Sequence, residues 1–258
     1  ATGDLSGYVT LDNGNGGTEA RYEMTIVIDT KHAVLDNITS MLVCFNGGIF
    51  RSGAKYKLTI QHSLATAVMS FTEKNINRES FVYGYGKGED VPNEMVVEYT
   101  NPLVFRNPKR FEYAEDEIDQ EIRGKRSTTV PCLGVTRQSQ SSRLAKQFLY
   151  QRKVNDIFCE FECNSQAVHV EPGDVVTVTH SRPGWTDKEF IVAEVNEVSF
   201  GKAKFILQSF NRSILDDGFG TRFFETFTFP ADSNPFAPLA DVTNLLIVEG
   251  GFGDNGVN

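Results

Sequence analysis

A run of closely spaced carboxylates is the strongest chemical candidate in this chain. Its members are Glu115, Asp116, Glu117, Asp119 and Glu121. Carboxylates at such short spacing could hold a divalent cation, or could supply the general acid and base of a hydrolase. The run lacks the D-x-D-x-D-G spacing of a calcium loop. A solvated acidic face is therefore the favoured interpretation, and an acid–base pair is the alternative.

A glycine-rich segment, Y-G-Y-G-K-G from Tyr83 to Gly88, is the second candidate. Glycine-rich loops can bring backbone amides close to a phosphate, usually at the start of a helix. This segment lacks the G-x-x-x-x-G-K-[ST] pattern, and no helix is predicted directly after it. We interpret it as a loop without a bound phosphate.

The histidines and cysteines do not form a metal-binding or nucleophilic pattern. The histidines are isolated, at His32, His62, His169 and His180. The cysteines are Cys44, Cys132, Cys159 and Cys163. Cys159, Phe161 and Cys163 alternate with glutamates, so they share one face of a predicted strand and are expected in the core. Free thiols in a reducing compartment are favoured over a disulfide framework.

None of these residues or motifs therefore has a predicted catalytic, cofactor-binding or metal-binding role. No G-x-S-x-G motif places a nucleophile beside a histidine. The sequence therefore predicts a protein that is not an enzyme and that carries no cofactor.

The composition is that of a globular protein. The 258 residues are 40% hydrophobic and 23% charged, and the net charge is −9. Tight binding to duplex DNA would need clustered lysine and arginine, which this balance argues against. It is compatible with a channel past which nucleic acid slides without specific binding. No apolar run reaches the roughly 18 residues of a membrane span.

Residues 1–105 predict a small α+β unit. A strand is expected over 21–29, and apolar residues at helical spacing predict a helix over 34–45 that ends at Asn46-Gly47-Gly48. Segments 49–50 and 56–60 flank R-S-G-A-K and predict a hairpin. Further strands are expected at 68–71 and 94–99.

Residues 106–211 predict one helix and an antiparallel barrel. The helix, 139–153, carries an apolar stripe that includes Leu144 and Phe148, and Ser139–Ser142 are candidates for its N-cap. A strand is expected at 128–133 before it. Strands at 155–163, 174–180, 188–198 and 203–211 suggest a closed or nearly closed barrel. Pro172-Gly173 predicts a type II turn between the first two, with positive φ at the glycine.

The last part of the chain predicts an arm and the start of another domain. Residues 212–240 contain many phenylalanines without a steady period, which indicates an extended arm packed onto the barrel or a neighbouring chain. Val242–Val248 suggests the first strand of a further β domain over 241–258. Because the chain opens at Ala1 without a methionine, we expect it to be a piece of a longer protein.

The order of several short motifs resembles the hub proteins of long-tailed phages, the group of the tail-tip attachment protein J and the hubs of gene transfer agents. In the second half the matching segments are G-V-T-R (134–137), R-L-A-K (143–146) and P-G-D-V-V (172–176). In the first half they are D-N-I-T-S-M-L (36–42), the stretch 47–60 and N-E-M-V-V-E-Y (93–99). The closing P-L-A-D-V-T-N-L-L-I-V is similar to the family's entry into fibronectin type III-like domains.

The resemblance implies an α/β hub domain (1–105), a β-barrel hub domain (106–211), an arm and the start of a fibronectin-like domain. It implies a structural virion protein that closes the distal end of a tail tube, links it to the host-recognition fibre and acts in attachment and DNA ejection. The implied partners are two further copies in a homotrimer, the distal tail protein, the tape measure protein, other tail-tip proteins and, through missing C-terminal domains, a host receptor.

Two other classes of function stay open. One is a tail-associated enzyme that degrades the cell wall with carboxylates of 115–121. The other is a carbohydrate-binding β module, which would need an exposed aromatic platform such as Trp185.

Overall fold

The computed structural model describes residues 10–12, 17–28, 31–52, 55–86, 91–102, 108–164, 169–199 and 201–215. The chain divides into two compact units, 1–224 and 225–258, and every described residue belongs to the first. The predicted arm lies outside the described residues from residue 216 onward. The predicted start of a fibronectin-like domain lies wholly outside them.

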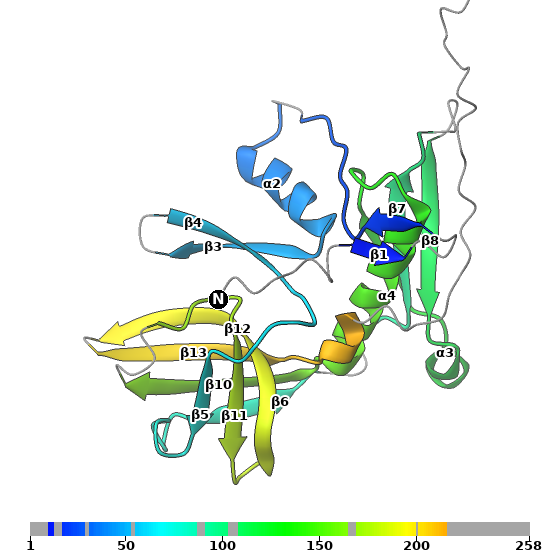
Figure 1. Cartoon of the computed structure of the whole chain (residues 1–258). Helices are drawn as coiled ribbons and strands as arrows, with labels where there is room; N and C mark the ends of the chain where they lie inside the picture. The colour runs from blue at the N-terminus through cyan, green and yellow to red at the C-terminus, as the bar shows by residue number, and fades with distance from the viewer. Residues whose placement is uncertain are drawn as a thin grey trace, which may run out of the picture. The chain divides into compact units, whose positions relative to one another are not determined.

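The described part is a β-rich α+β fold, which confirms the predicted class (Figure 1). The helices are α2 (Val34–Val43), α3 (Glu117–Arg123), α4 (Gln138–Val154) and the 3-10 turn η3 (Arg212–Leu215). The first strands are β1 (Thr10–Asp12), β2 (Thr18–Ala20), β3 (Gly47–Ser52), β4 (Lys55–Ile60), β5 (Met69–Thr72), β6 (Val82–Tyr85) and β7 (Glu94–Thr100). The remaining strands are β8 (Lys109–Glu115), β9 (Ser127–Pro131), β10 (Ile157–Asn164), β11 (Val175–His180), β12 (Trp185–Ser199) and β13 (Lys202–Ser209).

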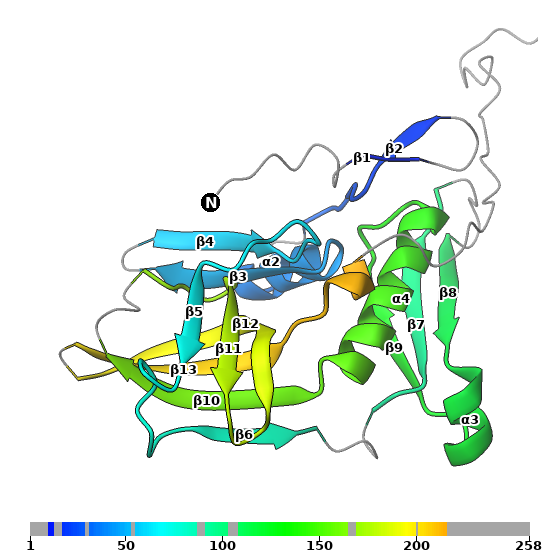
Figure 2. The ribbon, with the colours of Figure 1, turned by 60° about the horizontal axis from the view of Figure 1, so that its bottom comes forward.

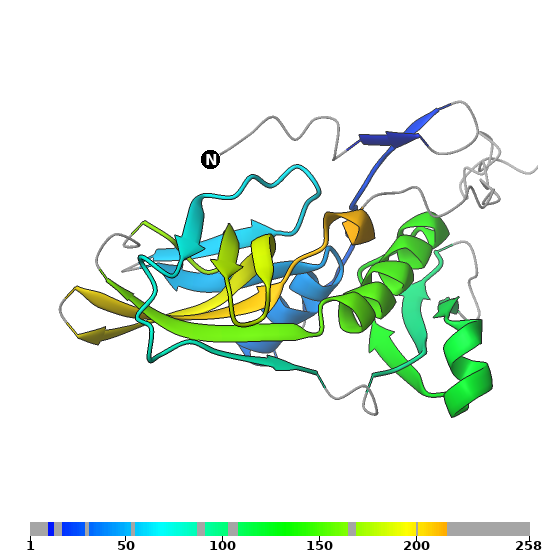
Figure 3. The same cartoon turned by 90° about the horizontal axis from the view of Figure 1, so that it is seen from below.

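The largest sheet has the strand order β5-β11-β12-β13-β10-β6. All neighbours are antiparallel except β5 and β11, which run parallel. Phe71 on edge strand β5 lies 4.9 Å, ring centre to ring centre, from Phe161 on β10. The sheet therefore curls around a single core. Figure 3 shows the ribbon of this sheet from below.

The expected barrel is thus an open one. Among the described residues, β5 and β6 do not pair with each other, and an isolated bridge from Ile76 to Cys163 is the link near this opening. The core face follows the predicted alternation, because Cys159, Phe161 and Cys163 are buried while the glutamates between them are half-buried.

A second core lies between α4 and the three-stranded sheet β8-β7-β9 (Figure 2). The helix begins and ends within a residue of the predicted bounds. Its apolar stripe packs on alternate residues of β7, with Leu144, Ala145 and Leu149 meeting Met95 and Val97. Alternation on the strand and helical spacing on α4 together explain why these residues form this layer.

Of the local predictions about the first half, two were confirmed and two were wrong. Helix α2 and the hairpin β3–β4 form as predicted. Residues 22–28 form no strand, although the Thr25 N–H donates to the Gly134 carbonyl. Conversely, Tyr83–Tyr85 lies in strand β6, which pairs with β10, instead of a loop. The deciding partner in each case lies far away in sequence, so local pattern did not reveal it.

Both large sheets take strands from both sides of residue 105. Strands β5 and β6 join the sheet formed by residues 157–209, and β7 pairs with β8 and β9. The division into two hub domains stays a prediction. The strand order shows that the chain does not complete one sheet before it begins the next.

The turn before β11 has the predicted type II geometry. The Asp174 N–H donates to the Glu171 carbonyl at 3.1 Å, and Gly173 has a φ of +91°. A Cβ at Gly173 would also lie 2.8 Å from Oγ1 of Thr59 in β4. The glycine therefore allows both the turn and the close approach of the hairpin.

We expect Gly173→Val to lower the free energy of unfolding by about 1–3 kcal/mol, because a β-branched residue is strained at positive φ. Urea denaturation followed by circular dichroism measures the change. Gly184→Val is the matched control, since Gly184 has a φ of +70° but no atom within 4 Å of an added Cβ. A Gly173→Val variant no less stable than the Gly184→Val variant would contradict a role for the Thr59 contact.

Candidate functional site

The acidic run extends from the end of β8 into helix α3, and two of its residues make contacts that stabilise the fold. Asp116 caps α3 by accepting the Asp119 N–H, and it forms an ion pair with Lys153 of α4. Asp119 accepts from the Asn93 side chain at 2.9 Å and from Arg126 at 3.0 Å. The other carboxylates of the run, Glu115, Glu117 and Glu121, are exposed.

The pKa values of the carboxylates at and near α3 disfavour a general acid. The hydrogen bond from Asn93, followed by that from Arg126, lowers the pKa of Asp119 although partial burial opposes it. Burial would raise the pKa of Glu94, but hydrogen bonds from Lys125 and Ser127 lower it overall. A general acid at neutral pH needs a raised pKa, so these carboxylates act as ionised acceptors.

The other candidate residues lie in buried surroundings that favour a structural role. Burial raises the pKa of the Cys132 and Cys159 thiols to about 12, which leaves them protonated. His180 is buried, stacks on Phe81 at 3.8 Å and accepts the Arg182 N–H. No group of three His, Cys, Asp or Glu residues in the described part of the chain could hold a metal ion. Trp185, the suggested sugar platform, is buried.

The G-V-T-R motif and the first turn of α4 instead form a polar clasp, which we define as Glu19, Arg137, Ser139, Gln140 and Arg143. Glu19 is its centre. The Arg143 guanidinium donates to one Glu19 oxygen at 2.6 Å, and the Ser139 hydroxyl donates to the other at 2.9 Å. Arg137 lies 3.4 Å from Glu19. Charge-assisted hydrogen bonds of this kind are stronger than neutral ones.

The clasp also holds the backbone of the end of β2 and of the segment that follows it. Arg137 donates to the Ala20 carbonyl at 2.6 Å, and Arg143 donates to the Arg21 carbonyl at 3.1 Å. Gln140 accepts the Glu23 N–H at 2.9 Å and donates to the Cys44 carbonyl at 3.0 Å. One buried glutamine thus joins α4, the segment after β2 and the end of α2.

The expected N-cap role of Ser139–Ser142 was wrong. Helix α4 begins at Gln138, its N-cap is Arg137, and no side chain caps it. All four residues are buried in the contact with the preceding segments. The serines and glutamine face protein and not water, because the segment 17–28 crosses the start of the helix. Only the arginines in the motif signalled that an acidic partner would be required.

Gly134 makes this crossing possible. A Cβ at this position would lie 2.9 Å from Cγ of Met24 and 3.2 Å from Sγ of Cys44. Such distances are shorter than ordinary van der Waals contact, so a side chain would push the crossing segment away.

The P-G-D-V-V motif forms a second junction. Glu171, the first residue of the turn, accepts from Lys57 of β4 at 2.5 Å, and Gly173 lies against Thr59 of the same strand. The turn thereby attaches the hairpin β3–β4 to the curled sheet. Two of the motifs that suggested a family are therefore places where distant segments join.

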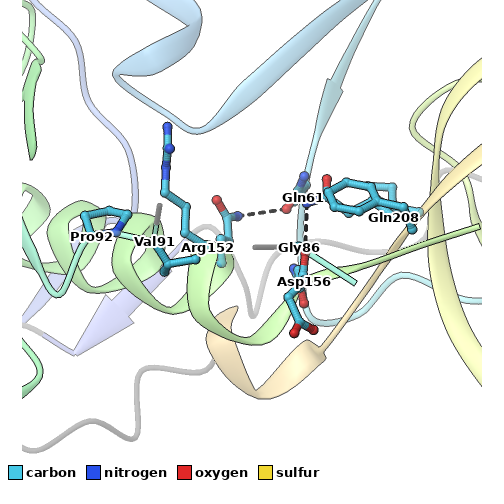
Figure 4. Close-up of a pocket in the computed structure, with 11 residues that line it drawn as sticks. Gln61, Gly86, Val91, Pro92, Arg152, Asp156 and Gln208 are labelled. Atoms are coloured by element: carbon cyan, nitrogen blue, oxygen red, sulfur yellow. Dashed lines mark hydrogen bonds between the residues drawn. The ribbon is translucent and has the colours of Figure 1, made fainter. Parts of the chain in front are cut away.

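A cavity of about 390 Å³ marks a third junction, where the end of β4, the end of α4 and the curled sheet meet (Figure 4). Gln151 of α4 donates to Gln61 at 2.9 Å, and Gln208 of β13 donates to the Asn155 carbonyl at 3.0 Å. The Gly86 N–H donates to the Asp156 carbonyl at 2.6 Å. Neutral amides and backbone groups, not a nucleophile and base, connect the two cores here.

The clasp, the turn and the cavity define a class of protein: a β-rich structural protein whose characteristic residues join separate chain segments. No described helix is both long and apolar enough to cross a membrane.

Comparison with known proteins agrees with this class. Residues 33–194 match the family described as putative phage tail protein. The match covers more than half of the chain, which therefore belongs to this family. It is a hub-like structural protein of the phage tail and a component of the virion.

A curated relative is the baseplate hub protein pb3 of Escherichia phage T5. It is 24% identical over 198 residues, which are 74% of this chain and 20% of the relative. The chain thus spans about a fifth of the length of the curated relative it matches.

Two solved structures share the fold. A chain of the native gene transfer agent virion has a TM-score of 0.55 and 11% identity, covering 69% of this chain and 39% of that one. The tail protein from Neisseria meningitidis MC58 has a TM-score of 0.51 and 12% identity, covering 71% and 57%. At these identities the likeness concerns the fold alone.

Proposed function

We propose that this chain is part of the central hub at the distal end of a phage tail, where it closes the tube and links it to the host-recognition fibre. The observation that carries the proposal is the set of junctions. The clasp joins three segments, and the turn at Gly173 joins two more. Such a protein can pass a mechanical load between its elements without separating them.

The chemistry of the junctions suits this task. The clasp combines ion pairs with hydrogen bonds to backbone carbonyls, which have defined directions and resist sliding. Apolar contacts alone are non-directional. Force from a bound receptor would therefore move the hub as a connected body and open the tube.

The charge suits a neighbour of passing DNA. The net charge of −9 opposes phosphate contacts, and in the proposed hub DNA moves past without specific binding. The proposed partners are two further copies in a homotrimer, the distal tail protein and the tape measure protein. A receptor would be bound through domains outside this chain.

The position in the particle can be tested by labelling. A peptide tag on the intact protein, detected with gold-conjugated antibody on complete phage particles, should place label at the end of the tail opposite the head. A tag on the major tube protein is the control and should label the tail along its length. Label along the tube from the tagged hub chain would overturn the proposed position.

A non-enzymatic role is part of the proposal. Purified protein should release no soluble fragments from host peptidoglycan, and the Glu115→Gln, Glu117→Gln, Glu121→Gln triple variant should behave identically. These three residues are exposed, so their neutralisation spares the structural Asp116 and Asp119. Hydrolysis by the wild type that is lost in the triple variant would establish the cell-wall-degrading alternative.

A further inference from the structure

The segment that links β4 to β5, residues 61–68, lies against the curled sheet, and we call it the linking segment. It lines a cavity of about 230 Å³ together with the turn before β11 and residues of β11 and β12. The Val68 N–H donates to the Val175 carbonyl at 2.8 Å, and Ala65 packs against Val175, Phe210 and Leu215. Half of the linking segment is exposed, and a segment with so little buried apolar surface can open without global unfolding.

His62 is the residue of the linking segment whose charge can change near neutral pH. Its side chain is half-buried, and the residue lines the cavity. Residues 61–68 contain no Asp, Glu, Lys or Arg. Histidine ordinarily changes charge between about pH 5 and 8, so acidification over this range adds one positive charge to the segment.

A fixed positive charge already lies beside this place. Arg212 of η3 donates to the carbonyl of Ser63, the residue after His62, at 3.4 Å. Its guanidinium also donates to both carboxylate oxygens of Glu189, at 2.6 and 2.7 Å. Because these charge-assisted bonds hold the guanidinium in place, Arg212 cannot move away from a charged His62 without losing them.

Two carboxylates also belong to the elements around the cavity. Glu189 of β12 is engaged by Arg212, and Asp174 of the turn before β11 accepts the Glu171 N–H at 2.9 Å. These carboxylates do not offset the surroundings of His62, because burial, followed by the charge of Arg212, lowers its pKa. The imidazole is therefore neutral at pH 7 while the linking segment is closed.

We propose that protonation of His62 opens the linking segment in mild acid while the two large cores stay folded. In the closed segment an imidazolium would be partly desolvated beside a guanidinium, whereas in the opened segment water solvates it. Opening would leave the hairpin β3–β4 attached to the curled sheet through the turn at Gly173. This acid-sensitive segment is independent of the proposed position in the phage tail.

The direction and the size of the effect follow from the two states of the segment. A histidine with a lowered pKa in the closed state stabilises that state fully above about pH 6.5, and this stabilisation is lost as the pH falls. If the closed state stayed wholly neutral, acidification from about pH 7.5 to 5.5 would raise the opening equilibrium about tenfold. Partial protonation of the closed state reduces this figure, so we expect an increase of about two- to tenfold.

Hydrogen exchange of the intact protein, measured by mass spectrometry at about pH 7.5 and 5.5, tests the proposal. Protection is corrected for the pH dependence of the intrinsic exchange rate. Peptides that cover residues 61–68 should lose about two- to tenfold in protection at the lower pH, whereas peptides of α4 should not change. In His62→Gln, whose side chain cannot be protonated, the loss in residues 61–68 should disappear.

The exposed His169→Gln is the matched control and should keep the pH dependence of the wild type. An NMR titration of the wild-type imidazole signals is a second measurement, which stays decisive if His62→Gln does not fold. It should give His62 a pKa below the ordinary value of about 6.5. Three results would overturn the proposal: equal protection of residues 61–68 at both pH values, an equal loss in the wild type and His62→Gln, or a His62 pKa at or above the ordinary value.

Discussion

Replacing Phe161 with alanine should lower the free energy of unfolding by about 3–5 kcal/mol, the largest effect expected for a single substitution in this chain. Phe161 is fully buried on β10. Its ring lies 4.9 Å from Phe71, 6.0 Å from Phe205 and 6.2 Å from Phe81, measured between ring centres. Alanine would remove the contacts to β5, to β13 and to the residue just before β6. It would leave a cavity that the curled sheet cannot fill.

Phe158→Ala is the control for this experiment. Phe158 lies three residues earlier on the same strand, with 44% of its surface exposed on the outer face. Its replacement removes the same atoms but leaves no closed cavity, so the loss should stay below about 1 kcal/mol. Urea denaturation gives both values. Equal losses for the two variants would contradict the assignment of the curled sheet's core to Phe161 and its neighbours.

Replacing Glu19 with alanine should destabilise the clasp by about 3 kcal/mol, at the low end of the range for broken buried ion pairs. The Glu19 side chain is 15% exposed and receives Arg143, Ser139 and Arg137. Without Glu19, the guanidinium groups of Arg137 and Arg143 lose a negatively charged partner inside the protein. We expect local opening of residues 18–26 before global unfolding. Hydrogen exchange measured by mass spectrometry should show faster exchange in that segment.

Glu23→Ala provides the comparison within the same segment. The Glu23 side chain contacts Arg137 at 3.4 Å but is 59% exposed, so water screens the pair. Its loss should cost less than about 1 kcal/mol and leave exchange nearly unchanged. Similar exchange in both variants would show that the burial of Glu19 does not set the strength of the clasp.

The sequence was most informative where a pattern was local and repeated. The stripe with Leu144 and Phe148 located α4 within a residue at each end, and the Pro172-Gly173 pair located a type II turn. Alternation around Phe161 gave the correct core face. In each case the residues that decide the structure lie within a few positions of one another.

The sequence was least informative where the decisive partner is distant. Tyr83–Tyr85 forms a strand because β10 pairs with it, and nothing in Y-G-Y-G-K-G indicates that partner. Ser139 looks like a cap until Glu19 is placed beside it, more than a hundred residues earlier in the chain. The clasp was not predicted for the same reason. It forms between two distant segments, and neither segment alone shows a pattern that indicates the contact.

The separation of paired strands also sets the order in which the protein can fold. Strands β7 to β9 and helix α4 are consecutive, so their core can form as soon as residue 154 has left the ribosome. Strand β5 ends at Thr72, and its partner β11 begins only at Val175. Closing that long loop costs chain entropy before any contact offsets it. During synthesis we expect β6 to stay unpaired until β10 is made and β5 to stay unpaired until β11 is made, a state in which neighbouring nascent chains can capture them. Slow translation before residue 175 would lengthen that exposure and lower the yield of assembled protein.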